Sequence, residues 1–473
     1  MQRLDRQSNG ITDGVIWKQL LKFFLPIMLG TFFQQLYNTV DAIVVGNFAG
    51  KEALAAVGGS ASRILDLVIG FFTGLASGAT VIVSQVYGAK DEQNVSRSVH
   101  TAMLLALGGG AIMTVIGLLI SPTLLVWMKT PPDTMAQSRD YVDIVFMAMI
   151  PGMVYNVGSA VLRAVGDSRR PLYFLIAACL TNIVLDVLFV VVLPVDDVKG
   201  VAIATSLSQV VSAILVCASL MRTKECYRLE LKKLRTNLKL LGQTIRIGLP
   251  TGLQSIMYAV SNIIITTSIN TFETDAVAAW VTLSKVDAMN WMIVNAFGIA
   301  VMTFVGQNYG AGRYDRVRRS MKTCLMMAMG TSILFGAVFA LFGRTLFGLF
   351  NKDEDVLKLG VLMMMYMAPS YWLYGPIEII SGSLRGAGDS RSCMLIMLGS
   401  FVLFRQIYLM IVYRVWGTVL PVAMGPGEAR NRHGVRQLSH LVGADVACVH
   451  LLLSPLPCAQ AQRGNDGSVS GRS

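Results

Sequence analysis

The chain has 473 residues, of which 54% are apolar and only 14% are charged, and its formal net charge is +12. A soluble domain carries about 25% charged residues, whereas a run of about 20 apolar residues is enough to span a bilayer. Because such runs recur along most of the chain, the composition excludes a water-soluble enzyme and predicts an all-α polytopic membrane protein whose partner is the lipid bilayer.

The apolar runs, taken in chain order, predict two successive groups of membrane-spanning helices. In the first half the predicted spans are 15–46, 53–86, 96–124, 138–162, 171–194 and 200–221. In the second half they are 245–271, 276–307, 320–349, 357–384 and 393–414. We therefore expect an N-terminal six-helix bundle at residues 1–222, a basic cytoplasmic linker at 223–240 and a C-terminal helix bundle at 241–424.

The composition changes after Gly425, where a twelfth span that starts near Thr418 should continue. Residues 426–473 contain no Lys, Ile, Met, Phe, Tyr or Trp, although they hold three of the four His residues of the chain. We interpret residues 425–473 as an atypical tail in which a shifted reading frame has replaced the twelfth helix. An ordinary disordered tail is the alternative, and sequencing the coding DNA across codon 425 distinguishes the two.

Basic residues gather at every second loop between the predicted spans. One side of the membrane would hold 20 of them, including those from Arg222 to Arg246, and the other side would hold 8. The positive-inside rule places the first side, and with it the N-terminus, in the cytoplasm of a multi-pass cell-membrane protein. Since the charge follows the topology and forms no continuous patch, it does not indicate nucleic-acid binding.

Several strings of the first half return in the second half. Leu162 to Arg169 reads LRAVGDSR, and Leu384 to Arg391 reads LRGAGDSR, 222 positions later. At the same offset, Gln85 to Ala89 (QVYGA) returns as Gln307 to Ala311 (QNYGA). Repeats this far apart indicate duplication of a whole half rather than a short-period solenoid. In membrane proteins, paired halves usually enclose a binding site.

Two acidic residues lie inside predicted spans of the first half. Asp41 is in the first span, and Asp186 is in the fifth, four residues after Asn182 and on the same helix face. Intramembrane carboxylates are energetically costly and generally face a cavity or a partner. We expect a coupling-ion site at Asp41, Asn182 and Asp186, with further oxygens from Asn156 and Thr205. Oxygen ligands suit Na⁺, whereas two neighbouring acids can share a proton, so both ions remain open.

Polar side chains also form stripes on the first and seventh predicted spans. Gln34, Asn38 and Asp41 are spaced by four and three residues and therefore share one helix face. The seventh span carries a matching stripe of its own. We expect these stripes to line a substrate cavity. The predicted lining residues are Gln34, Tyr37, Asn38, Gln254, Tyr258, Asn262 and Glu378.

Two further residues of the predicted spans suggest specific roles. Pro26 removes a backbone hydrogen bond from the first span and is predicted to act as a hinge. Glu378, in the tenth span, is interpreted as a second cation or substrate contact. Its alternative role is that of a structural partner for Arg405 or Lys285.

The sequence has no motif of a known catalytic centre. It lacks HExxH, a P-loop, a serine elbow and a CxxC pair. Gly386 to Asp389 fits the GxGD string of intramembrane aspartyl proteases, but the charge pattern places Asp389 and its counterpart Asp167 in loops. We expect the glycine to form a turn and the aspartate to cap the next helix. The protein is therefore predicted not to be an enzyme and to need no cofactor besides a coupling ion.

The strings NTVDAIVVG, ALAAVG, QVYGA and QNYGA, together with the LRxxGDSR repeat, resemble the prokaryotic type of the multidrug and toxic compound extrusion (MATE) family over about residues 10–424. The resemblance implies two pseudo-symmetric six-helix bundles that alternate between inward- and outward-open states. It also implies that Asp41, Asn182 and Asp186 build the cation site and that the first helix bends at Pro26. The implied function is secondary active export of organic cations or drugs in exchange for Na⁺ or H⁺, and we expect a monomer.

Two alternative functions remain open at this point. A flippase for lipid-linked oligosaccharides, from the same superfamily, would favour a cavity lined with Arg and Lys. Lys285 and Arg405 are the only clear intramembrane cations in the sequence. Alternatively, loss of the twelfth helix would leave a transport-dead copy.

Overall fold

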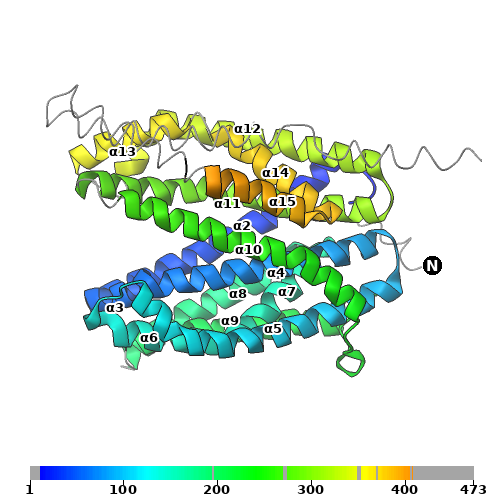
Figure 1. The fold of residues 1–473 in the computed structure, drawn as a ribbon, viewed down its shortest axis with the longest axis horizontal. Coiled ribbons are helices and arrows are strands. Elements are labelled where there is room, and N and C mark those ends of the chain that lie inside the picture. Colours follow the sequence, from blue (N-terminus) through cyan, green and yellow to red (C-terminus); the bar gives the residue numbers. More distant parts are fainter. Residues whose placement is uncertain are drawn as a thin grey trace, which may run out of the picture. The chain divides into compact units, whose positions relative to one another are not determined.

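The computed structural model describes residues 11–193, 197–269, 274–348, 353–368, 371–404 and 407. Within these ranges all regular secondary structure is helical (Figure 1). The α-helices are α2 (Ile16–Val44), α3 (Gly50–Ala56), α4 (Ser62–Gly88), α5 (Glu92–Trp127), α6 (Pro132–Met147), α7 (Met149–Ala164), α8 (Arg169–Asp186), α9 (Asp197–Arg222), α10 (Leu238–Ile269), α11 (Thr274–Gly310), α12 (Tyr314–Gly348), α13 (Glu354–Met367), α14 (Tyr371–Ala387) and α15 (Ser390–Met397). Four short π-helical segments continue α-helices or link them, namely η1 (Val45–Ala49), η2 (Val57–Ala61), η3 (Val187–Val192) and η6 (Leu398–Phe404), and η4 (Leu231–Lys233) is a 3₁₀-helix.

Most predicted spans correspond to single long helices, but two are divided. The predicted span 138–162 consists of α6 and α7, which meet at a bend of 50°. Pro151 lies in the first turn of α7, where its missing N–H removes no helical hydrogen bond. The predicted span 357–384 likewise consists of α13 and α14. Both pairs stay apolar across the division, so the hydrophobic pattern did not reveal it.

Seven helical stretches of the described chain are long and apolar enough to cross a membrane, or eight if α6 and α7 form one bent span. This number is lower than the twelve spans predicted. A part of α13, Val356–Met365, is apolar but shorter than a span. Residue Arg405, the predicted twelfth helix and the tail 425–473 lie outside the described residues.

Contacts divide the chain into two compact units. The first comprises Met1–Val260, Ala288–Ala328 and Glu378–Met394, and the second comprises Ser261–Asp287, Met329–Ile377 and Leu395–Ser473. In the first unit, α2 and α9 both pack along α8, and α5 and α9 both pack along α7. The core between these helices contains Leu125, Phe146, Met153 and Leu162, which are fully buried. In the second unit, Phe339 packs edge-to-face against the buried ring of Tyr371.

Helices α4 and α10 of the first unit approach each other so closely that their backbones are in contact. Gly74 of α4 faces Gly252 of α10, and Gly78 faces Gly248. A Cβ atom added at Gly78 would lie 2.8 Å from the backbone nitrogen of Gly248, which is closer than atoms can approach. Small residues permit this kind of contact between membrane helices. Any larger side chain at these positions would force α4 and α10 apart.

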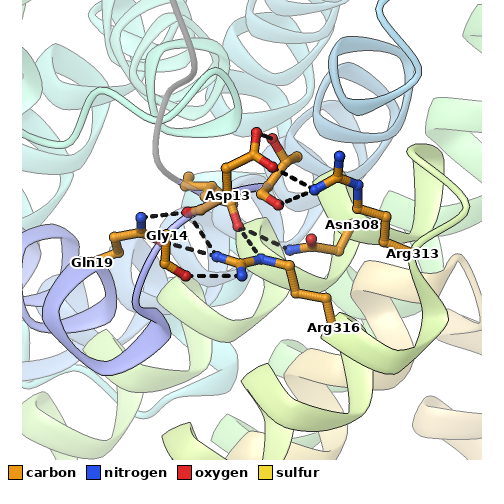
Figure 2. Close-up of polar contacts among 8 residues, drawn as sticks. Asp13, Gly14, Gln19, Asn308, Arg313 and Arg316 are labelled. Atoms are coloured by element: carbon orange, nitrogen blue, oxygen red, sulfur yellow. Dashed lines mark hydrogen bonds and ion pairs between the residues drawn. The ribbon is translucent and has the colours of Figure 1, made fainter.

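Residues 11–14, which precede α2 and which we call the N-terminal strap, are held by side chains from α11, α12 and the loop between them (Figure 2). Arg316 of α12 donates three hydrogen bonds to backbone carbonyls of the strap, at 2.8 to 3.0 Å. Arg313 pairs with the carboxylate of Asp13 at 2.5 Å. Asn308 of α11 donates to another strap carbonyl at 3.3 Å. These contacts fix the start of α2 within the first unit.

Candidate functional site

The first candidate site consists of two carboxyl groups and an amide from α2 and α8. Asp41 of α2 lies beside Asn182 and Asp186, which are one turn apart on α8. The three residues are 7%, 1% and 0% exposed. The structure therefore brings together the three residues that the sequence analysis grouped as the main ion site.

Most polar atoms of this group have no hydrogen-bond partner among the described residues. They are Oδ1 of Asp41, both amide atoms of Asn182 and both carboxylate oxygens of Asp186. Unsatisfied buried polar atoms destabilise a protein, and two buried carboxylates repel each other. A cation or a shared proton between the carboxylates would remove both penalties. Since the group offers mainly oxygen ligands, a hard cation such as Na⁺ fits it better than a transition metal.

A cavity of about 220 Å³ lies next to this group, inside the first unit. Its walls come from α2, α4, α7, α8 and α9, with Ile299 from α11. Ligand pockets typically measure about 300–1,000 Å³, so this cavity suits a small ligand or one part of a larger ligand. The residues predicted from the sequence that line it are Pro26, Gln34, Tyr37, Asn156 and Asn182.

Two of the predicted ion ligands have no described contact with the carboxylate pair. The amide nitrogen of Asn156 donates to Gly152 of its own helix at 2.9 Å, although the residue lines the cavity. Thr205 of α9 is buried, and its hydroxyl has no partner among the described residues. The structure thus places Asn156 on the cavity wall and leaves the hydroxyl of Thr205 buried without a partner among the described residues.

The remaining predicted lining residues are not among those that line this cavity. Asn38 is exposed and is not part of its wall. Gln254 accepts a long hydrogen bond from Sγ of Cys393 at 3.8 Å. Tyr258 stacks on Trp291 with ring centroids 5.8 Å apart. Asn262 belongs to the second unit. Gln254, Tyr258 and Asn262 of the predicted stripe on α10 are thus absent from the lining of this cavity.

Glu378 forms an ion pair that the sequence analysis did not suggest. Its Oε1 lies 2.5 Å from a guanidinium nitrogen of Arg385, seven residues further along α14, and both side chains are only 13% exposed. The sequence had suggested Lys285 or Arg405 as partners, because Arg385 was assigned to a loop. In the structure α14 continues to Ala387, and this extension brings Arg385 within reach of the carboxylate.

The two LRxxGDSR strings form equivalent turns between helices. Gly166 and Gly388 both have a φ of +97°, a left-handed conformation that glycine adopts without strain. Asp167 accepts hydrogen bonds from the backbone nitrogens at the start of α8, at 3.0 and 3.1 Å, and Asp389 does the same at the start of α15, at 3.1 Å. The predicted role of turn and cap is confirmed, and it accounts for the GxGD string without proteolysis.

The repeated strings also bind each other, in an arrangement that we call the glutamine clasp. Gln85 of α4 donates from Nε2 to the carbonyl oxygen of Gly386 at 2.9 Å. Gln307 of α11 donates from Nε2 to the carbonyl oxygen of Ala164 at 2.7 Å. Gln307 lies 222 residues after Gln85, and Gly386 lies 222 residues after Ala164, so both the donors and the acceptors are equivalent positions of the repeat. Each half therefore supplies a glutamine that binds the turn of the other half.

The helical fold, the buried carboxylate pair and the adjoining cavity together define a polytopic membrane transporter. The sequence model of the MatE family matches residues 26–188 and 250–410. Because this match covers more than half of the chain, the protein belongs to the MatE family, which consists of transporters and not of enzymes. The two separate matches fall on the two halves of the internal repeat.

Comparisons with individual proteins agree with this assignment. The chain is 27% identical to the probable multidrug resistance protein YoeA of Bacillus subtilis over 415 residues, which cover 86% of each protein. It is 21% identical to the multidrug export protein MepA of Staphylococcus aureus over 406 residues, which cover 84% of this chain and 88% of that protein. A structure of a multidrug resistance MATE family transporter in an outward-facing conformation superimposes with a TM-score of 0.84 at 19% identity, covering 94% and 96% of the two chains. The predicted all-helical polytopic membrane fold is confirmed.

Proposed function

We propose that this protein is a secondary active antiporter that exports organic cations and other drug-like molecules across the cell membrane in exchange for Na⁺ or H⁺. The observation that carries the proposal is the pair of buried carboxyl groups, Asp41 and Asp186, which lie next to a cavity. Three of their four oxygens have no hydrogen-bond partner among the described residues. Relatives of this chain are described as multidrug resistance and export proteins, which supports the same class of substrate.

The proposed coupling depends on competition for the same negative charge. Asn182 belongs both to the carboxylate group and to the cavity wall, so an ion and a substrate bind next to each other. Binding of Na⁺ or H⁺ neutralises the carboxylates and weakens their attraction for a cationic substrate. An ion gradient can then drive release, because a ligand shifts a conformational equilibrium by its difference in affinity for the two states.

Helix α2 provides a route by which ion binding can change the conformation. Asp41 and Pro26 lie fifteen residues apart on α2, which is about 22 Å along a helix axis. In this structure α2 runs through Pro26 as one continuous helix. Because proline leaves a backbone carbonyl of the preceding turn without its usual partner, a bend at Pro26 is the least costly deformation of α2. We assign the hinge to this residue.

The test measures transport by the purified full-length chain in proteoliposomes, with Na⁺ and proton gradients imposed separately. A fluorescent organic cation should accumulate against its gradient under one of the two ion gradients. Asp41→Asn should reduce this ion-driven transport at least tenfold, because it removes one of the two charges that the ion neutralises. Asp140→Asn is the matched control, since Asp140 is an exposed carboxylate that pairs with Lys199 at 3.2 Å.

The proposal fails if Asp41→Asn transports as fast as the unmodified chain, or if neither gradient drives transport. We further propose that the N-terminus faces the cytoplasm, in line with the distribution of basic residues, and that the protein acts as a monomer. A membrane-impermeant thiol reagent applied to intact cells should then label a cysteine introduced at Lys129 and leave one introduced at Lys90 unlabelled.

A further inference from the structure

Arg163, near the end of α7, lines the same cavity as Asn156 and Asn182. Its Nε is buried and has no hydrogen-bond partner, and no ion pair with a carboxylate is formed by Arg163 anywhere in the described chain. The predicted span 138–162 ends one residue before Arg163 and so leaves it in the following loop, whereas the structure places it in the cavity wall.

The internal repeat shows that Arg163 lacks the carboxylate partner that the equivalent arginine of the second half has. The 222-residue offset relates Arg163 to Arg385 and also relates Asn156 to Glu378. In the second half of the repeat, Glu378 binds Arg385 at 2.5 Å and neutralises it. In the first half the position of the glutamate holds the neutral Asn156, whose amide nitrogen is already used within α7. The same helical arrangement therefore has a compensated guanidinium in one half and an uncompensated one in the other.

An uncompensated, partly buried guanidinium attracts an anion. Burial of a charge without a partner is strongly unfavourable, and a bound counter-ion relieves this penalty. The planar guanidinium offers several N–H donors in a fork that matches a carboxylate. Because Arg163 lies on a cavity wall and not in a closed core, a ligand in the cavity can provide that carboxylate.

The two ends of the cavity are lined by different polar side chains. Arg163 lies close to Tyr155, whose hydroxyl donates to the carbonyl oxygen of Pro171 in the first turn of α8. Asn182, beside Asp41 and Asp186, lies eleven residues further along α8, or about 16 Å at the usual helical rise. One end therefore presents a positive guanidinium, and the other presents the amide of Asn182, which lies beside the two buried carboxyl groups.

We propose that Arg163 is an anion-binding subsite of the substrate cavity and that it recognises the carboxylate of a zwitterionic, drug-like substrate. The amine of such a substrate lies toward the end of the cavity that holds Asn182, and its carboxylate lies at Arg163. This inference rests on the proposed export function and adds a substrate class to it, since a transporter with carboxylates alone would select simple cations.

The experiment compares two dyes that differ in one carboxylate, tetramethylrhodamine and its methyl ester. Binding to the purified full-length chain is measured by fluorescence anisotropy. Arg163→Gln should weaken binding of the zwitterionic free acid about tenfold and leave binding of the cationic ester unchanged, which corresponds to loss of one charge-assisted contact. Arg163→Lys should retain part of the affinity for the free acid. Arg170→Gln, which removes an exposed guanidinium paired with Asp167, is the matched control and should change neither affinity.

A second variant tests the same subsite without removal of the arginine. Asn156→Glu reproduces the arrangement of Glu378 and Arg385 and should neutralise Arg163 internally. We expect it to weaken binding of the free acid as Arg163→Gln does, while a thermal unfolding midpoint equal to that of the unmodified chain shows that the fold is intact. Equal weakening of both dyes, or no weakening of the free acid, in the Arg163→Gln protein overturns the proposal.

Chloride titration separates a substrate carboxylate from an inorganic anion. If chloride raises the thermal unfolding midpoint of the unmodified chain but not of Arg163→Gln, and the two dyes bind alike, the subsite holds an inorganic anion and the substrate assignment is wrong. If the free acid binds through Arg163 but neither dye is transported under an ion gradient, the subsite stands and the proposed export function fails.

Discussion

At the scale of single residues, the ion pair between Asp13 and Arg313 makes the N-terminal strap sensitive to acid. The hydrogen bond from Arg313 holds the pKa of the Asp13 carboxyl below its ordinary value of 3.8. A carboxyl group whose pKa is lowered on folding stabilises the protein above its unfolded pKa, and this contribution is lost as the pH falls through the folded pKa. The unmodified chain should therefore lose stability below about pH 4 through this group.

The measurement is the thermal unfolding midpoint between pH 5 and pH 3, compared with that of Asp13→Asn. The variant should show a shallower decline, and the difference should shrink at high salt because the pair is about half exposed, at 51% and 52%. Arg313→Gln should behave like Asp13→Asn, since either change removes the pair. Identical pH profiles for all three proteins would show that the strap contact does not stabilise the fold.

The residues of the candidate site differ in how easily the sequence revealed them. Asp41 and Asp186 were predictable, because a charge within an apolar run is costly and therefore conspicuous. Arg163 was missed, because an arginine at the end of a span has the same appearance as a loop residue. The repeat contained the missing signal, since Asn156 stands where the other half has Glu378. A comparison of the two halves, position by position, would have shown the unpaired charge.

At the scale of helices, the glutamine clasp should hold α4 and α11 against the turns of the opposite halves. Each of its two hydrogen bonds contributes about 1 kcal/mol. Loss of one should therefore shift the equilibrium between the closed and the locally opened turn about fivefold toward the opened turn. Gln307→Ala should speed amide hydrogen exchange in residues 162–170, which contain its acceptor Ala164. Gln85→Ala should instead speed exchange in residues 384–391, which contain Gly386. Hydrogen-exchange mass spectrometry of peptides from the two turns makes the comparison.

The control for the clasp is Gln35→Ala, which truncates an exposed glutamine on α2. It should leave exchange in both turns unchanged. If Gln85→Ala and Gln307→Ala both speed exchange across the whole chain, the glutamines stabilise the fold in general and do not act as a specific clasp. Opening of this clasp is the change that an alternating transporter of the proposed kind would require during each cycle.

Helix positions were largely predictable from apolar runs, because a helix must satisfy its own backbone hydrogen bonds in lipid. The breaks within helices were not. The bend between α6 and α7 lies in a stretch that remains apolar on both sides, and the π-helical segments η1 and η3 lie at the ends of apolar runs that show no change in pattern where the helix type changes. The clasp was likewise invisible in the sequence, since two glutamines 222 residues apart indicate duplication but do not show which carbonyl each one binds.

At the scale of the whole molecule, the proposed mechanism requires a thermodynamic linkage between the coupling ion and the substrate. If Na⁺ or H⁺ at Asp41 and Asp186 lowers substrate affinity by some factor, the substrate must lower ion affinity by the same factor. Coupling free energies between sites are typically about 1–3 kcal/mol, or about 5–150-fold in affinity. A transporter that lacked this linkage would bind both ligands without exchanging one for the other.

This linkage can be measured with purified protein in detergent. A cationic dye should bind at least fivefold more weakly in saturating Na⁺ or at low pH than without the ion, and only one of these two conditions should have the effect if the site is selective. Asp186→Asn should abolish the ion dependence, because a single remaining carboxylate no longer requires an ion for neutralisation of a repelling pair. Asp140→Asn should keep it in full. If dye affinity is independent of both Na⁺ and pH in the unmodified chain, the carboxylate pair does not couple ion to substrate, and a different site must drive transport.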